Sequence, residues 1–260
     1  MNRSIAVLFA IALPISHALA DARIEYRATE GGGASMQSLL IGHGKLRTDT
    51  DANTSVILDP DTRSMTVLDH GKRQFTRIGP AELQQLSETL NEAMAQLEQA
   101  MASVPPEMRA QMQGMLGGAI PGMGGEPMVR IVDTGSQERV AGHACTVYLT
   151  EMQGKTVSEA CMGGPGALAE LTASDRAVLD RALAMTRDMM EQLAKSPLGQ
   201  LVQATPFRDG MVPLRITDFD NNRRSTSEFA GVQREALAAD LFQVPSGYRE
   251  QKIEMPRGRR

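Results

Sequence analysis

The 260-residue sequence contains no tryptophan, and aromatic residues make up only 3% of it. It also lacks an excess of basic residues, because 27 Lys and Arg stand against 31 Asp and Glu, which gives a formal net charge of −4. That balance argues against a nucleic-acid partner, which requires a concentrated basic surface. No apolar run is long enough to cross a bilayer as a helix. We therefore expect a protein that neither binds nucleic acid nor spans a membrane.

Motifs of catalytic centres are also missing. No G-x-S-x-G elbow marks a nucleophilic serine, and the glycine runs lack the Lys-Ser/Thr of a phosphate loop. Asp49-x-Asp51-x-Asn53 begins like a calcium loop, but Thr54 stands where that loop needs glycine. Beyond the first twenty residues the histidines are dispersed and indicate no triad: His43, His70 and His143. We expect no enzyme activity and no cofactor.

The first twenty residues have the layout of a cleavable secretory signal. Arg3 supplies the positive charge, and residues 5–15 form a short apolar run. Ala18-Leu19-Ala20 then supplies the small residues of a cleavage site. No cysteine follows the expected cut after Ala20, so lipid anchoring is not expected. The sequence predicts a periplasmic protein whose mature chain begins at Asp21.

The spacing of apolar residues alternates between strand and helix periods along the chain. Six short segments between residues 23 and 78 predict an antiparallel meander. Apolar stripes predict helical insertions near 80–116 and near 172–196, the second opened by a capping-box variant at Thr172–Asp175. The remaining predicted strands are 128–133, 138–141, 144–151, 155–160, 211–219 and 224–232. This order favours one α+β domain at 21–250, followed by a basic flexible tail at 251–260.

The two cysteines flank a predicted hairpin. A three-residue loop at 152–154 would place Glu151 opposite Lys155 and Cys145 opposite Cys161. A bridge between the two cysteines closes a loop of 15 intervening residues, worth about 3 kcal/mol in the chain-entropy model. Because the spacing does not match a redox or metal motif, we predict a structural disulfide.

Methionine is abundant, with 17 residues, and three of them share a face of the first insertion. Met108, Met112 and Met115 follow the i, i+4, i+7 spacing, and Met123 lies in the glycine-rich segment 117–125. Three interpretations are open: plain packing on the sheet, an adaptable lid over an apolar ligand, and a thioether site for Cu(I). The glycines make segment 117–125 the candidate for a mobile lid.

The strand rhythm and the end of the chain carry a family resemblance. The segments are 24–28, 44–49, 55–59, 64–69 and 74–78, followed by F-x-V-P-x-G-Y at 242–248. Together with the export signal, they resemble an uncharacterised domain family of secreted bacterial proteins. More remotely, the chain is similar to the periplasmic lipoprotein carriers of the LolA and LolB type.

This resemblance implies a strongly curved antiparallel β half-barrel, with helices covering a concave face that holds acyl chains in the carriers. The chain departs from the carriers in its methionine-rich insertion and its disulfide hairpin. We therefore expect a soluble, non-catalytic periplasmic binding or carrier protein for a lipid or acyl chain, or for an envelope protein partner. The alternative is a periplasmic Cu(I)-binding protein that uses residues 108–128.

Overall fold

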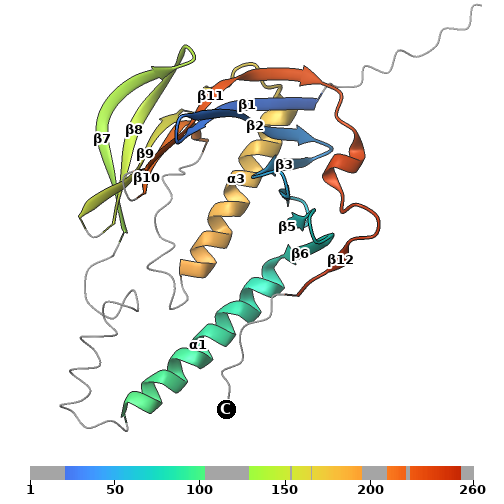
Figure 1. Cartoon of the computed structure of the whole chain (residues 1–260), viewed down its shortest axis with the longest axis vertical. Helices are drawn as coiled ribbons and strands as arrows, with labels where there is room; N and C mark the ends of the chain where they lie inside the picture. Colours follow the sequence, from blue (N-terminus) through green and yellow to red (C-terminus); the bar gives the residue numbers. More distant parts are fainter. Residues whose placement is uncertain are drawn as a thin grey trace, which may run out of the picture.

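A computed structural model describes residues 21–102, 129–152, 154–164, 166–194, 210–220 and 223–252. Within these residues one curved, open sheet dominates the molecule (Figure 1), in the strand order β12-β6-β5-β4-β3-β2-β1-β11-β10-β9-β8-β7. The first half contains β1 (Asp21–Glu30), β2 (Gly33–Gly42), β3 (Lys45–Asp49), β4 (Thr54–Asp59), β5 (Ser64–Asp69) and β6 (Gln74–Ile78). The second half contains β7 (Val129–Val140), β8 (His143–Met152), β9 (Lys155–Gly163), β10 (Val212–Asp220), β11 (Arg223–Glu235) and the short β12 (Arg249–Glu250).

The sheet consists of two antiparallel meanders joined edge to edge. Each strand from β1 to β6 pairs with the next, as does each strand from β7 to β11. The alternation predicted for the first strand is confirmed, because Ala22 and Ile24 are fully buried while Arg23 and Glu25 are not. The six strands predicted between 23 and 78 are likewise present.

The two meanders meet where β1 pairs with β11, in a register that runs from Asp21 opposite Glu235 to Glu30 opposite Ser225. Polar contacts hold this seam: Arg23 donates to Glu235, and the Tyr26 hydroxyl donates to the Pro213 carbonyl at 3.1 Å. Burial raises the pKa of the Tyr26 phenol above its ordinary value. The hydroxyl therefore stays protonated and keeps its role as a donor.

One predicted strand break is wrong. The segments predicted at 128–133 and 138–141 form the single strand β7, with an irregular register between Asp133 and Gln137. Gly135 adopts a positive φ of 69° there, which lets the backbone bulge. The Thr134 hydroxyl donates to the Val147 carbonyl of β8 at 2.7 Å, so the bulge stays attached to its neighbour.

The predicted disulfide is present, but its predicted register is wrong. Met152, rather than Glu151, lies opposite Lys155, and a further irregularity near Val157 shifts the ladder again. Cys145 therefore lies opposite Gly163, and Cys161 opposite Val147. The two cysteines form a diagonal pair with their Cα atoms 5.3 Å apart, a separation that a disulfide can span. The bridge is buried in the main core.

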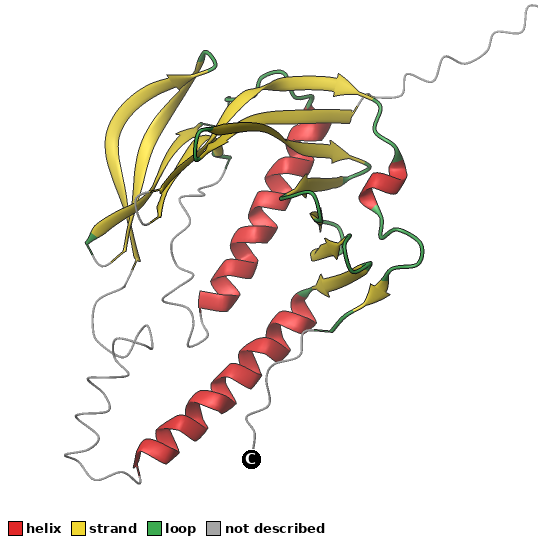
Figure 2. Cartoon of the chain, in the orientation of Figure 1, coloured by secondary structure: helices red, strands yellow, loops and turns green. Residues whose placement is uncertain are grey.

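Two helices accompany the sheet (Figure 2), α1 (Pro80–Ala102) and α3 (Ala173–Ala194). Helix α3 lies on one face of the sheet, where Leu179 and Ala182 pack in the main core with Ile24, Ile41 and other strand residues. Helix α1 instead contacts α3 and strand β6, which lies next to the edge strand β12. No helix among the described residues is long and apolar enough to cross a membrane. The part of the first predicted insertion that follows Ala102, residues 103–116, lies outside the described residues.

The chain then returns across the first meander as a C-terminal strap, residues 236–252. Its short 3-10 helix η1 (Ala239–Phe242) buries Phe242 beside Leu40 and Leu237. The following segment pairs β12 with β6 in parallel, Arg249 opposite Gln74. The strap thus covers the edge of the sheet from which α1 departs, and it contains the F-x-V-P-x-G-Y motif noted in the sequence.

Candidate functional site

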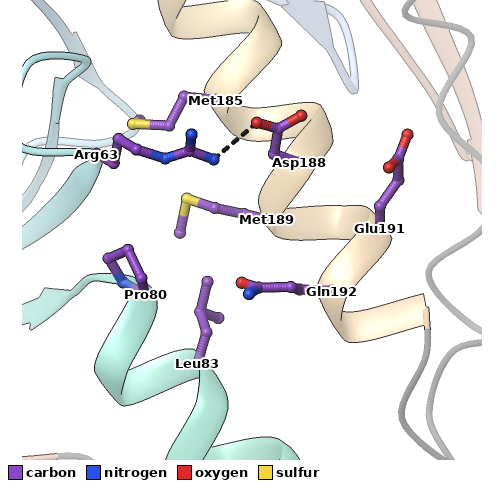
Figure 3. Close-up of a pocket in the computed structure, with 8 residues that line it drawn as sticks. All are labelled: Arg63, Pro80, Leu83, Met185, Asp188, Met189, Glu191 and Gln192. Carbon is purple, nitrogen blue, oxygen red and sulfur yellow. Dashed lines mark hydrogen bonds and ion pairs between the residues drawn. The ribbon is translucent and has the colours of Figure 1, made fainter.

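A cleft lies between the start of α1 and the second half of α3 (Figure 3). The turn between β4 and β5 forms its third side. Its volume is about 260 Å³. Four lining residues are apolar and four are polar: Pro80, Leu83, Met185 and Met189, with Arg63, Asp188, Glu191 and Gln192. The cleft is therefore amphipathic.

The α1 wall of the cleft is fixed by the first turn of that helix. Gly79 donates its N–H to the Glu82 carboxylate at 2.9 Å, and Leu83 donates to the Gly79 carbonyl at 3.0 Å. This is half of a capping box, and Pro80 occupies the first helical position, where its missing N–H costs nothing. The cap holds Leu83, which is buried, against α3.

The α3 wall is fixed at the opposite end of that helix, by the predicted capping box. Asp175 donates its N–H to the Thr172 hydroxyl at 3.2 Å, and its carboxylate accepts from the Thr172 N–H at 3.3 Å. Arg234 of β11 also donates to this carboxylate. Met185 and Met189 lie roughly three and four helical turns after Asp175. Met185 is buried, Met189 is half-buried, and both reach the cleft.

The rim of the cleft is an ion-pair clasp between the β4–β5 turn and α3. Arg63 lies 2.7 Å from Asp188, and Arg181 lies 2.5 Å from Asp61, so each side supplies one cation and one anion. All four side chains are about half exposed. Exposed pairs of this kind contribute at most about 1 kcal/mol each. The clasp can therefore open at small cost.

The turn that carries the clasp is itself rigid. The Asp59 carboxylate accepts the N–H groups of Asp61 and Thr62, both at 3.1 Å, and lies 3.1 Å from the Lys45 ammonium. Burial raises the pKa of Asp59, but the Thr62 and Lys45 contacts outweigh it, and the net pKa lies below the ordinary range. Arg63 sits at φ 51°, in the left-handed region, which directs its side chain towards α3.

A second polar cluster lies away from the cleft and contains the only Ser–His contact recorded among the described residues. The Ser55 hydroxyl is 2.7 Å from His70 Nε2, and His70 Nδ1 is 2.7 Å from the Tyr248 hydroxyl. Ser55 also donates to Asp49 at 2.5 Å and accepts from Arg47 at 2.9 Å. Because Ser55 is only 1% exposed, the arrangement suits an anchor for the strap better than a nucleophile, which a substrate must reach.

The other two dispersed histidines also make local structural contacts. His43 Nε2 lies 3.0 Å from the Leu237 carbonyl of the strap. His143 lies 3.4 Å from Glu170 and stacks edge-on against Phe229. The structure does not bring His43, His70 and His143 together.

The predicted methionine site cannot be placed. Met108, Met112, Met115 and Met123 lie outside the described residues, as do the glycine-rich segment 117–125 and the predicted secretory signal. In the part of the chain that is described, no group of three or more His, Cys, Asp or Glu side chains is arranged to hold a metal ion. The predicted Cu(I) site, which uses thioether ligands instead, stays a prediction.

Comparisons with known proteins give only distant structural likenesses. No protein-family model and no curated protein matches the sequence. The chain is similar to a structure of PNGF-II with a TM-score of 0.41 and 7% identity, over 90% of this chain but 31% of PNGF-II. It is also similar to a DUF1329 family protein from Desulfovibrio piger, with a TM-score of 0.26 and 10% identity over 87% of this chain and 91% of that one.

Proposed function

We propose that this protein is a non-catalytic periplasmic binding protein that holds a single apolar chain in the cleft between α1 and α3. The observation that carries the proposal is the cleft itself, with an apolar wall of Leu83, Met185 and Met189 beneath the Arg63–Asp188 pair. Methionine side chains adapt their shape to different apolar occupants, which suits a binding site for flexible chains.

The size of the cleft limits what it can hold. Sites for drug-sized ligands enclose about 300–1,000 Å³, so a cleft of about 260 Å³ accommodates one chain end rather than a whole lipid. The polar residues at the rim, Gln192 among them, can meet a polar headgroup that remains in water. An acyl chain of a lipid or lipoprotein fits this description, and an apolar side chain of an envelope protein is the competing occupant.

In this proposal the curved sheet is a half-barrel of the carrier type, and α3 covers its concave face. The buried Cys145–Cys161 disulfide supports an oxidising compartment, because such bridges persist in exported proteins. The half-exposed clasp supports entry from solvent, since opening it breaks only two surface ion pairs.

The test has two stages. Native mass spectrometry of protein purified from the periplasm reveals any co-purified lipid. Delipidated protein is then titrated with dodecyl maltoside, a neutral single-chain probe. We expect Met189→Glu to weaken probe binding at least tenfold, because the charge must be desolvated when the chain enters. Met190→Glu is the matched control, since Met190 is also half-buried but is not among the residues that line the cleft.

Four outcomes decide the proposal. Loss of binding in Met189→Glu with near-normal binding in Met190→Glu supports it. Equal effects of both variants, or no binding of the probe by the unaltered protein, contradict it. A periplasmic protein, rather than a lipid, that co-purifies and is displaced by Met189→Glu would assign the cleft to a protein partner.

A further inference from the structure

Exposed large apolar side chains are concentrated at one end of the sheet. Among the described residues they are Met36, Met152 and Phe219, which are 53%, 39% and 37% exposed. Each lies near the turn of a different hairpin: β1–β2, β8–β9 and β10–β11. We call this end, with these three residues and their cross-strand partners, the three-hairpin rim.

The strand registers place the three turns at the same end of the sheet. Glu30, at the end of β1, lies opposite Ser225, near the start of β11, which sets the β1–β2 turn beside the β10–β11 turn. Asp218 of β10 lies opposite Ser158 of β9, which sets the β8–β9 turn on the same side. With strands about 4.8 Å apart, Met152 and Phe219 are separated by about 10 Å and Phe219 and Met36 by about 14 Å along the rim.

Each of the three apolar residues lies opposite a basic residue. Met36 lies opposite Arg27, Met152 opposite Lys155, and Phe219 opposite Arg224. The Arg224 guanidinium lies over the Phe219 ring, 5.9 Å from its centre. No ion pair is recorded for Arg27, Lys155 or Arg224 within the described residues.

One acidic residue, Glu228 of β11, lies opposite Arg27 on the side of β1 away from Met36. The other acidic residues of the rim lie opposite different partners. Glu30 lies opposite Gly33 and Ser225, and Asp218 lies opposite Ser158 and Ser225. Asp220 lies opposite Arg223, and its carboxylate therefore already has a basic neighbour. Lys155 and Arg224 lie opposite no acidic residue and are therefore available to an outside anion, whereas Arg27 shares its position with Glu228.

We propose that the three-hairpin rim docks on an anionic lipid surface. Its apolar side chains enter the boundary between headgroups and acyl chains, while the neighbouring Lys and Arg side chains remain among the phosphates. The three pairs stand on separate hairpins and form no groove. A fluid bilayer needs no shape complementarity, whereas a stable protein interface requires about 800 Å² of fitted surface on each partner.

The experiment measures binding to lipid vesicles by flotation. We expect the protein to bind vesicles that contain phosphatidylglycerol in phosphatidylcholine, and to release them at high salt. Each basic residue near an anionic surface contributes about fivefold to binding. The triple variant Arg27→Gln, Lys155→Gln and Arg224→Gln should therefore bind about a hundredfold more weakly.

A matched control removes three charges elsewhere. Arg139, Arg249 and Lys252 are exposed, and they lie at the opposite end or the opposite edge of the sheet. Changing these three to Gln should alter vesicle binding less than twofold. We expect both triple variants to fold, because all six positions are exposed. Circular dichroism of both variants verifies this.

The absence of tryptophan supplies a second, independent measurement. Phe219→Trp introduces the only tryptophan of the chain, and its emission should shift to the blue when anionic vesicles are added. Equal binding to pure phosphatidylcholine, equal losses in both triple variants, or an unshifted emission would overturn the proposal. Binding of an acidic protein in place of vesicles would overturn it as well. All of these readouts are independent of the α1–α3 cleft.

Discussion

Helices α1 and α3 are similar in length, 23 and 22 residues, and both open with an acidic residue that reaches back to cap the first turn. Their surroundings differ. In α3 the side chains of Val178, Leu179 and Ala182 belong to the main core. In α1, among the side chains that the structure describes, Leu83 alone is buried.

The comparison shows that an apolar stripe specifies a helix but not the partner of its apolar face. Helix α3 is held on the sheet by two kinds of contact: its side chains pack in the main core, and Arg234 of β11 donates a hydrogen bond to the Asp175 carboxylate of its cap. Helix α1 is held at its first turn, where the chain leaves strand β6. The cleft forms where the firmly held helix meets the loosely held one, which is a favourable place for a site that must admit a ligand.

Core truncation should separate the two helices most strongly. Leu179→Ala removes a fully packed side chain from α3 and should lower the free energy of unfolding by about 2–5 kcal/mol. Leu86→Ala removes a half-buried side chain from α1 and should cost about 1 kcal/mol. Urea unfolding measures both. Similar losses would mean that α1 is embedded as firmly as α3.

Removing the helix caps should lower the free energy of unfolding more in α3 than in α1, by a smaller difference than core truncation gives. Asp175→Ala deletes the bonds to Thr172 and to Arg234 and should cost about 2 kcal/mol. Glu82→Ala deletes one cap bond at the edge of the fold and should cost about 0.5–1 kcal/mol. Thermal unfolding followed by circular dichroism checks the order. Asp175→Asn keeps an acceptor without the charge, so its loss should fall between those of the unaltered protein and Asp175→Ala.

Acidification should produce the smallest effect, through the turn that clasps α3. The pKa of Asp59 lies below its ordinary value in the folded protein, so this carboxylate adds stability above the unfolded-state pKa of about 3.9. That stability is lost as the pH falls below about 4 and through the folded-state pKa. On acidification from neutral pH to below about pH 4, the free energy of unfolding should therefore fall less in the Asp59→Asn variant than in the unaltered protein. Urea titrations at several pH values measure this. A parallel decline in both proteins would remove Asp59 from the explanation.

Local patterns in the sequence predicted most of the strands, both described helices and the disulfide. Alternation and turn residues are local properties, so the first meander and the Thr172–Asp175 cap follow from neighbouring residues. The register at Cys145 and Cys161 was not predicted for two reasons. The turn places Met152 opposite Lys155, one residue from the expected pairing, and the irregularity near Val157 shifts the ladder by one residue more without a glycine or proline to mark it.

Only the apolar residues of the cleft could be predicted from the sequence. Leu83 and Met189 lie in the predicted apolar stripes of the two helices. Arg63 and Asp188, however, are separated by 125 residues, and nothing in either local sequence indicates the other. Long-range pairs of this kind depend on where the helices lie, which periodicity does not determine. The predicted lid residues, Met108 to Met123, lie outside the described residues and stay a prediction.

The seam between β1 and β11 has a consequence for the order of folding. Arg23 and Glu235, which are hydrogen-bonded across this seam, are 212 residues apart in the chain. The pairing of β1 with β11 therefore cannot form until both meanders have been synthesised. Contacts of such long sequence separation make folding slow, since the loop must be closed before the contact is gained. Because this pairing is deferred, the chain does not complete its fold, and can still pass through a narrow pore, until β11 is available.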